Sequence, residues 1–389
     1  MPRPYFAACC ALLNSLILLA ALPAPADDIA AQLAAIAKVG PLGAGSTAAR
    51  AACDQLSTAS ATELPRLLVA METPNPVAAN WYRAAYEAIV ARELAAPRPQ
   101  FPIPELQSFV RDSKRGGRPR RLALALCDRL QPGFAVAVIP EFLDDPEFRD
   151  DAVDAALAAG QQALDKQQTG LARERFQKAY DHARTSDQVV NAAGKLQSLG
   201  VSTDIAAHLG LVVDWWVIGP FDAPQFSGFD AVYPPEKSVD LQAQYSGQDG
   251  RTLRWTRYHT NDPLGLADLA LALAPAKEAV AYAYAELQSP RAMTAQLRCG
   301  ADDNCSVWLN GERVFGRNQW LNGIRFDRFM AAVQLREGTN RVLVKVCQGP
   351  QHKNPEVVNA WTLYARFCDE AGQGVGLRSL LPAAEETGK

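Results

Sequence analysis

The side chains of this chain that could do chemistry include two adjacent carboxylates, Asp302 and Asp303. They precede an alternating apolar and polar strand that ends at the turn dipeptide Asn310-Gly311. Paired carboxylates in one turn could hold a hard cation such as calcium, which prefers several oxygen ligands. Only these two ligands are evident, and Asp is common in turns because its side chain bonds nearby backbone groups. The sequence therefore favours a solvated hairpin turn without a cofactor, with calcium as the alternative.

Trp308 lies on the same strand and could contact a ligand. It shares the strand phase of Ser306 and Asn310, opposite the apolar side chains of Val307 and Leu309. An aromatic ring on a polar face can stack on the C–H surface of a sugar, or it can cover a loop, because large aromatic rings seldom stay exposed without a partner. The residues that follow and could line the same surface are Trp320, Arg325 and Asp327. Together with Trp308 they form the candidate ligand-binding set.

Recognisable catalytic motifs are absent from the sequence. It contains no H-E-x-x-H, G-x-S-x-G, P-loop or C-x-x-C pattern, and its four histidines are never paired at ligand spacing. Carboxylates are numerous, but a glycosidase pair is recognised only by its geometry, so Asp327 and Glu286 are candidates by residue type alone. The sequence predicts no catalytic residue and no enzyme. A carbohydrate-active hydrolase, or an accessory subunit of one, is the alternative.

The N-terminus is organised like a cleavable secretory signal. Arg3 precedes an apolar stretch over 6–22, and Ala24-Pro25-Ala26 offers the small residues that a signal peptidase reads. Cleavage after Ala26 leaves 363 residues with 38 basic and 42 acidic side chains, a net charge of −4. This mild charge does not indicate nucleic acid or an anionic membrane as a partner. No later segment is apolar enough to span a bilayer, so we expect a secreted or periplasmic protein.

Six cysteines remain after this cleavage, an even number that permits disulfides in an exported protein. Cys299 and Cys305 flank the Asp302-Asp303 turn and share the inward phase of the neighbouring apolar residues. Directly opposed residues of an antiparallel pair lie within disulfide reach. The sequence therefore predicts either a Cys299–Cys305 disulfide across a hairpin or two small buried thiols.

The composition changes near residue 205 and predicts two different domains. Residues 27–205 are rich in Ala, Leu and charged residues. Short helices with Pro in their first turn are expected to begin at Leu64, Ile103 and Ile139, and each is followed by a second helix. Their spacings of 39 and 36 residues are typical of helical-pair repeats. The third unit has Asp at the turn between its helices, then Arg and Ala on the second helix, within 143–153, and in this it resembles a HEAT repeat. We therefore expect an α-solenoid over 27–205, in which stacked neighbours form the core.

Residues 206–385 hold six of the seven tryptophans and read as short strands separated by turns. Eight or nine such strands without a long helix between them predict an antiparallel β-sandwich. Lys345 alternates with Val344 and Val346 on one of these strands, so we expect its side chain on a solvated face.

The block 215–369 is similar to a domain of secreted proteins of planctomycete-type bacteria, often fused to helical repeats. The matching stretches are 216–221, 232–236, 281–284, 307–311 and 343–348. More distantly, the Asp-Asp turn and the Val-Trp-Leu-Asn-Gly stretch resemble galactose-binding-like and PA14-like sandwiches with the jelly-roll fold. Some of those domains bind sugars, a few of them through calcium at a paired Asp. The resemblance implies a fold and a compartment, and it implies no activity.

These observations predict an exported, non-enzymatic binding protein of multidomain α and β class. Its helical repeats would contact another exported protein, and its β-sandwich would bind a glycan or a partner. A purely structural scaffold is a further alternative, in which both domains make only protein contacts.

Overall fold

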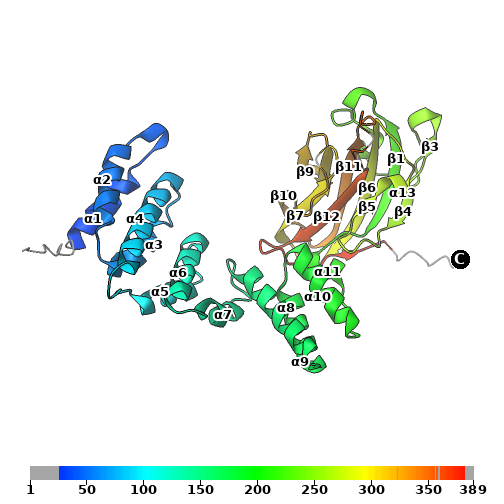
Figure 1. Cartoon of the computed structure of the whole chain (residues 1–389). Helices are drawn as coiled ribbons and strands as arrows, with labels where there is room; N and C mark the ends of the chain where they lie inside the picture. The colour runs from blue at the N-terminus through cyan, green and yellow to red at the C-terminus, as the bar shows by residue number, and fades with distance from the viewer. Residues whose placement is uncertain (1–25, 322, 355, 358–359, 382–389) are drawn as a thin grey trace, which may run out of the picture. The chain divides into compact units, whose positions relative to one another are not determined.

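The computed structural model describes residues 26–321, 323–354, 356–357 and 360–381 of the 389-residue chain. The chain divides into two compact units, Met1–Val138 and Ile139–Lys389 (Figure 1). The expected signal segment 1–26 lies outside the described residues, apart from Ala26. Within the described part of the chain, no helix is both long and apolar enough to cross a membrane.

The first unit is helical. Its α-helices and 3-10 helices (η) are α1 (Ala26–Ala37), η1 (Pro41–Gly43), α2 (Ser46–Leu56), η2 (Ala61–Glu63), α3 (Leu64–Ala70), α4 (Pro76–Leu94), α5 (Ile103–Arg111), α6 (Gly117–Leu130) and α7 (Phe134–Val138). The helix starts predicted at Leu64 and Ile103 are confirmed as α3 and α5, each with Pro in its first turn, where the missing N–H costs nothing. Asn75 then caps α4, because its Oδ1 accepts the backbone N–H groups of Val77 and Ala78.

The second unit begins with helices and continues as strands. Its helices are η3 (Ile139–Glu141), α8 (Arg149–Asp165), α9 (Thr169–His182), α10 (Ser186–Ser198), α11 (Ile205–Leu209), η4 (Pro224–Phe226), α12 (Pro234–Lys237), η5 (Gln248–Gly250) and α13 (Leu269–Ala272). The third predicted helix start, at Ile139, is the short 3-10 helix η3. Asp145 shapes the turn before α8, since its Oδ1 accepts the N–H groups of Glu147 and Phe148 at 2.9 and 3.0 Å.

Helices α8 and α9 approach closely at Gly160. A Cβ added there would lie 2.6 Å from the buried ring of Phe176. We therefore expect Gly160→Ala to destabilise the unit by about 1–3 kcal/mol through overpacking. Gly194 in α10 is the matched control, because a Cβ there meets nothing within 4 Å, and Gly194→Ala should be stabilising by up to ~1 kcal/mol. Urea unfolding of both variants checks this, and equal midpoints would contradict the close approach.

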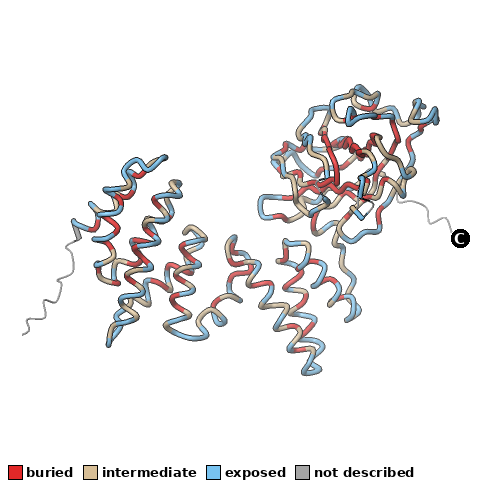
Figure 2. The backbone as a smooth tube through the Cα atoms, turned by 45° about the horizontal axis from the view of Figure 1, so that its top comes forward, coloured by how far each residue is buried: buried red, intermediate tan, exposed pale blue. Residues whose placement is uncertain are grey.

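The strands of the second unit form an antiparallel β-sandwich, which confirms the predicted antiparallel sheets. They are β1 (Asp214–Asp222), β2 (Tyr245–Ser246), β3 (Thr252–Leu253), β4 (Thr256–His259), β5 (Ala267–Asp268), β6 (Ala279–Ser289), β7 (Met293–Ala301), β8 (Cys305–Leu309), β9 (Glu312–Arg317), β10 (Phe329–Leu335), β11 (Gly338–Gln348), β12 (Thr362–Cys368) and β13 (Arg378–Ser379). The larger sheet has the order β4-β1-β6-β11-β8-β9, with β13 also paired to β6, and the smaller has the order β10-β7-β12-β5. Residues of both sheets share one apolar core (Figure 2).

Strand β6 shows how the sequence builds two faces. Its alanines at 279, 281, 283 and 285 point into the shared core, whereas Val280, Tyr282 and Tyr284 point outward. The outward side chains are also buried, because the segment 223–255 packs over this face. We call it the covering segment, and it forms a second apolar cluster with the sheet, the outer apolar cluster. The larger sheet is therefore covered on both sides over part of its area.

This cover makes the prediction for Lys345 wrong. Lys345 is buried, and its ammonium donates hydrogen bonds to the carbonyl oxygens of Phe229 and Ala231 at 3.1 and 2.5 Å. It also pairs with Glu236 at 2.9 Å. The alternation of the strand placed Lys345 correctly on the outer face. It carried no information about the distant segment that covers that face.

The predicted hairpin between Cys299 and Cys305 is also wrong. Strand β7 belongs to the smaller sheet and β8 to the larger, so residues 302–304 cross from one sheet to the other. In register, Cys299 lies opposite Phe329 and Ala365. Both cysteines are buried free thiols, and a hydrogen bond with Cys305, together with burial, raises the pKa of Cys299. The two thiols meet across the core of the sandwich.

We expect the thiols to be unreactive in the folded protein. All six cysteines of the described residues are buried, and structural thiols buried in apolar surroundings are inert because a reagent in solution does not reach them. Residues 27–389 should therefore give no rapid reaction with Ellman's reagent when folded, and six thiols after unfolding in guanidinium. Four thiols after unfolding without reductant would instead show that one pair, such as Cys299–Cys305, is oxidised.

Candidate functional site

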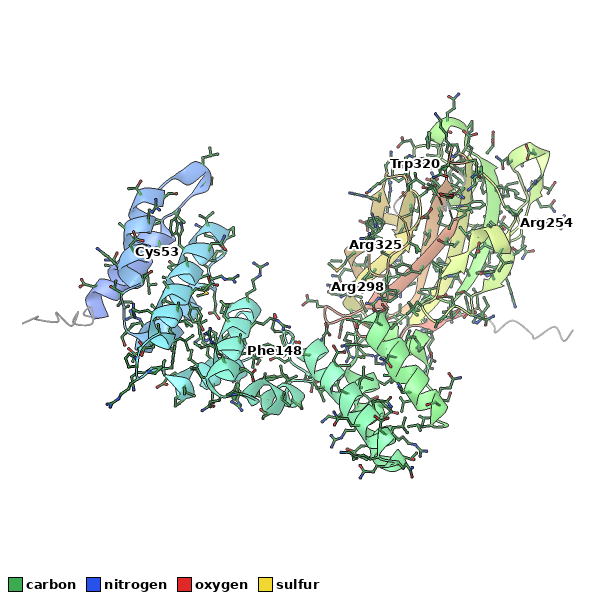
Figure 3. The ribbon with its side chains drawn as sticks, in the orientation of Figure 1. Cys53, Phe148, Arg254, Arg298, Trp320 and Arg325 are labelled. Carbon is green, nitrogen blue, oxygen red and sulfur yellow. The ribbon has the colours of Figure 1, made fainter. Side chains whose placement is uncertain are left out.

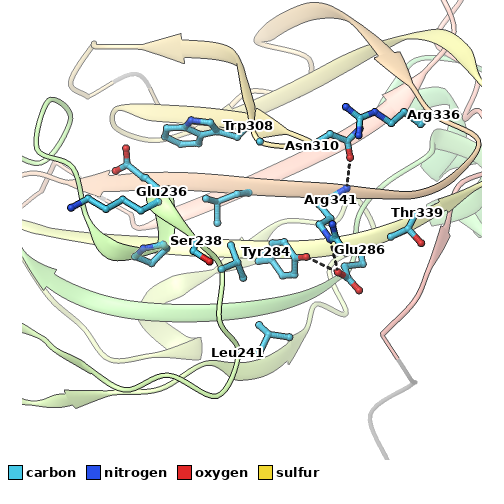
Figure 4. A pocket seen from close by; sticks show the side chains of 15 residues that line it. Glu236, Ser238, Leu241, Tyr284, Glu286, Trp308, Asn310, Arg336, Thr339 and Arg341 are labelled. Atoms are coloured by element: carbon cyan, nitrogen blue, oxygen red, sulfur yellow. Dashed lines mark hydrogen bonds and ion pairs between the residues drawn. The ribbon is translucent and has the colours of Figure 1, made fainter.

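A hollow of about 470 Å³ lies on the outer face of the larger sheet, beside the covering segment (Figure 4). Its floor is made by Tyr284 on β6, Leu343 on β11 and Trp308 on β8. These strands are neighbours, and Leu343 is paired with both Tyr284 and Trp308 in register. The floor therefore follows from outward positions that lie side by side on three adjacent strands. We call this hollow the Trp308 pocket.

One wall of the Trp308 pocket is formed by residues 235–239 and Leu241 of the covering segment. Glu236 fixes this wall to the sheet, because it pairs with Lys345 at 2.9 Å and accepts a hydrogen bond from the Tyr282 hydroxyl. Tyr233 strengthens the anchor by donating from its own hydroxyl to the carbonyl oxygen of Asp222 at 2.8 Å. The exposed side chains of Lys237 and Ser238 follow directly after this anchor, at the edge of the pocket.

The opposite rim consists of two turns tied together by Asn340, which is fully buried. Asn340 accepts from the side-chain amide of Asn310 at 3.0 Å and from the backbone N–H of Arg336 at 2.9 Å. Asn310 and Gly311 both have positive φ, 55° and 87°, and join β8 to β9, which confirms the predicted Asn-Gly hairpin. The rim is thus a built structure that presents Asn310 and Arg336 toward the pocket.

An ion pair lies on the sheet between the floor and the rim. Glu286 accepts from the Tyr284 hydroxyl at 2.7 Å and from Arg341 Nε at 3.1 Å. The hydrogen bond from Tyr284, assisted by Arg341, holds the pKa of Glu286 below its usual value. Glu286 is therefore ionised at neutral pH. Burial raises the pKa of Tyr284, so that its hydroxyl remains a donor.

Trp308, the first of the predicted ligand-binding residues, is half-buried and lines the pocket. The guanidinium of Arg313 lies 5.8 Å from its ring centroid and 5.1 Å from that of Phe229. Arg313 is itself held by a 2.8 Å hydrogen bond to Ser306. Trp308 also packs against the outer apolar cluster, and these neighbours restrict the indole before a ligand stacks on it, which lowers the entropy cost of binding.

The structure does not bring the other three predicted ligand-binding residues into this pocket. Trp320 packs edge-on against Phe226, with ring centroids 4.5 Å apart. Arg325 is exposed in the segment before β10 and lies apart from Trp320 (Figure 3). Asp327 pairs with Arg298 and Arg366 at 2.7 and 2.5 Å. These three residues are close in the sequence, but they do not lie on one surface with Trp308.

Asp327 belongs to a buried network that joins helix α11 to the sandwich. Arg366 has no exposed surface, and it binds both carboxylate oxygens of Asp327, at 2.7 and 2.5 Å. It also donates to the carbonyl oxygens of Leu209, at the end of α11, and Gly372, at 3.0 and 2.9 Å. Burial alone would raise the pKa of Asp327, but the hydrogen bonds from Arg366 and Arg298 outweigh it and hold that pKa low. The role of this network is structural.

Asp302 and Asp303 are buried, so the prediction of a solvated turn is wrong. The two carboxylate oxygens of Asp303 accept the backbone N–H groups of Leu321 and Gly349, each at 2.8 Å. Burial raises the pKa of both aspartates. The carboxylates thus hold neighbouring loops onto the crossing between the sheets. Within the described ranges, no group of three or more His, Cys, Asp or Glu side chains could hold a metal ion.

Some pocket residues that we did not predict belong to an alternating pattern that is visible in the sequence. On β6, large residues at 280, 282, 284 and 286 alternate with alanines, a pattern typical of one packed face and one face with a different partner. Arg341 and Leu343 alternate in the same way on β11. The signal shows that an outer face is used, but it does not show which segment completes the wall.

No protein-family model and no curated protein sequence matches the chain. Among solved structures, it is similar to a GH2 β-galacturonidase from Eisenbergiella tayi bound to glycerol, with a TM-score of 0.22 and 8% sequence identity. The match covers 40% of this chain and 25% of that chain. A β-glycosidase from Bacteroides vulgatus matches with a TM-score of 0.22 and 13% sequence identity, over 40% of this chain and 20% of that chain. Faecalibacterium prausnitzii β-glucuronidase matches with a TM-score of 0.20 and 13% sequence identity, over 40% of this chain and 31% of that chain. The chain spans less than a third of each neighbour's length, and likeness of this extent assigns it neither a family nor an activity.

Proposed function

We propose that the protein is an exported carbohydrate-binding protein that holds a sugar in the Trp308 pocket and does not cleave it. The observation that carries this proposal is an oriented, half-buried indole at the floor of a pocket with polar side chains around its edge. Sugar rings offer a C–H face that stacks on aromatic rings and hydroxyl groups that need planar polar partners. Asn310, Glu286 and Arg341 supply such partners within the same pocket.

The state of the two carboxylates that line the pocket supports binding without hydrolysis. A glycosidase needs one carboxyl group that stays protonated as the general acid and a second as base or nucleophile. Glu236 is paired with Lys345 and Glu286 with Arg341. The pKa of Glu286 is lowered, which is the wrong direction for a general acid. We therefore expect no release of reducing sugar from any glycan that the protein binds.

We also propose that helix pairs α3–α4 and α5–α6 are HEAT-like repeats, with α5 packed against α3. Their succession of a short helix begun by Pro and a longer partner supports this proposal. Contact with another exported protein through these pairs stays a prediction from the sequence.

A glycan panel probed with residues 27–389 tests the proposed function. We expect saturable binding to a restricted set of glycans, with unchanged binding when EDTA is added, because no metal cluster is found among the described residues. The bound glycans are then incubated with the protein overnight and analysed for cleavage products, which should be absent. Failure to bind any glycan would overturn the proposal, and cleavage would replace it with the hydrolase alternative.

A further inference from the structure

The Trp308 pocket carries more positive than negative charge at its edge. Its charged lining residues are Glu236, Lys237, Glu286, Arg336 and Arg341. Both carboxylates are already matched, Glu236 by Lys345 behind the wall and Glu286 by Arg341. Lys237 and Arg336 form no ion pair with any described residue, and both side chains are exposed. Two unmatched cations therefore border the mouth from opposite sides.

These two cations are held by different elements whose positions are fixed. Lys237 ends α12, directly after the buried anchor of Glu236. Arg336 lies in the turn whose backbone is bound by Asn340, through the N–H at 2.9 Å and the carbonyl oxygen at 2.8 Å. Because each cation is attached beside a buried hydrogen-bonded group, the positive charge belongs to the site and not to a mobile tail.

We propose that the glycan held in the Trp308 pocket is anionic, a sugar that carries a carboxylate or a sulfate group. This inference rests on the proposed function and names its ligand class. Anionic groups along the glycan would accept charge-assisted hydrogen bonds from Arg336 on one side of the mouth and from Lys237 on the other, while a sugar ring stacks on Trp308. A neutral glycan would leave both cations without a counterion and would gain only the stacking and hydroxyl contacts.

The test compares glycans that differ only in charge. Isothermal titration calorimetry of residues 27–389 uses an oligogalacturonide and its fully methyl-esterified form for the carboxylate, and a sulfated carrageenan oligosaccharide and its desulfated form for the sulfate. We expect one of the two anionic ligands to bind about tenfold more tightly than its neutral counterpart at low salt, since two exposed charge contacts act together. The preference should shrink as sodium chloride is raised to 0.5 M, because salt screens exposed charges. The pair that shows the preference identifies the anionic group.

The double variant Lys237→Gln/Arg336→Gln should lose this preference, so that the charged and neutral members of the pair bind alike. Arg254→Gln is the matched control, because Arg254 is an exposed arginine of the same unit that does not line the pocket (Figure 3). It should keep the full preference. All three substituted side chains are exposed, so melting temperatures should match those of the parent protein.

The outcomes separate this inference from the proposed function. Equal binding of charged and neutral glycans overturns the anionic ligand and leaves the carbohydrate-binding proposal in place. A preference that survives in the double variant also overturns it, since the selectivity would then come from other residues. If the glycan panel and all four oligosaccharides fail to bind, both proposals fail together.

Discussion

Trp308→Ala should abolish most of the glycan binding. An aromatic anchor at the centre of a binding site typically contributes about 2 kcal/mol or more when it is truncated, which corresponds to roughly a thirtyfold rise in Kd. The indole packs against the outer apolar cluster and beside the Arg313 guanidinium, 5.8 Å from its ring centroid, so its orientation is restricted before the ligand arrives. Calorimetric titration with a glycan that the parent protein binds measures the effect. Trp308→Phe keeps a ring in place and should recover part of the affinity.

Trp320→Ala is the matched control for this prediction. Both tryptophans pack against the same outer apolar cluster, but only Trp308 lines the pocket. The two alanine variants should lose similar stability, because each removes a partly buried indole. Trp320→Ala should bind the glycan like the parent protein. Equal losses of affinity in the two variants would show that binding responds to the general integrity of the covering segment and not to stacking on Trp308.

Arg366→Met should destabilise the second unit by about 3–5 kcal/mol, the usual cost of removing one partner from a buried ion pair. The substitution leaves the carbonyl oxygens of Leu209 and Gly372 without their donor and removes the bidentate partner of Asp327. Urea unfolding followed by tryptophan fluorescence reports on this unit, because six of the seven tryptophans lie between 206 and 385. Arg341→Met removes an exposed ion pair and should change the midpoint little. If Arg366→Met unfolded at the same urea concentration as the parent protein, the structural role of the Arg366–Asp327 network would be contradicted.

The same network predicts a dependence of stability on pH. The pKa of Asp327 is lower in the folded than in the unfolded chain, so the unfolded state takes up a proton first as the solution is acidified. The stability that Asp327 contributes is therefore fully present above its ordinary pKa of about 4 and is lost as the pH falls through the lower folded value. Unfolding midpoints measured between pH 6 and 3 should fall less steeply in Asp327→Asn than in the parent protein. If the unfolding midpoints of the two proteins fell in parallel with pH, the lowered pKa of Asp327 in the folded chain would be contradicted.

The sequence was sufficient where a feature depended on neighbours along the chain. Pro65 and Pro104 mark the first turns of α3 and α5, and the positive φ angles of Asn310 and Gly311 form the hairpin that this dipeptide predicts. The antiparallel sheets could be predicted for the same reason, since alternation and turn residues are local.

Features that depend on packing between distant segments could not be predicted. Lys345 has the alternation of a solvated position, yet it is buried by residues more than a hundred positions earlier in the chain. Asp303 reads as a turn residue, but its carboxylate binds Leu321 and Gly349. Of the candidate site, Trp308 could be recognised from its strand phase, whereas Glu236, Lys237 and Arg336 join it only through the fold.

The most direct test of the account is to observe the indole of Trp308 while a sugar binds. In ¹H–¹⁵N spectra of residues 27–389, the Nε1–H resonances of Trp308 and Trp320 are assigned from the Trp308→Phe and Trp320→Phe variants. During titration with a glycan that binds in the panel, the Trp308 resonance should shift and saturate at the calorimetric Kd, while the Trp320 resonance stays in place. Saturable binding that leaves the Trp308 resonance unmoved would contradict the account, because the sugar would then lie elsewhere on the protein.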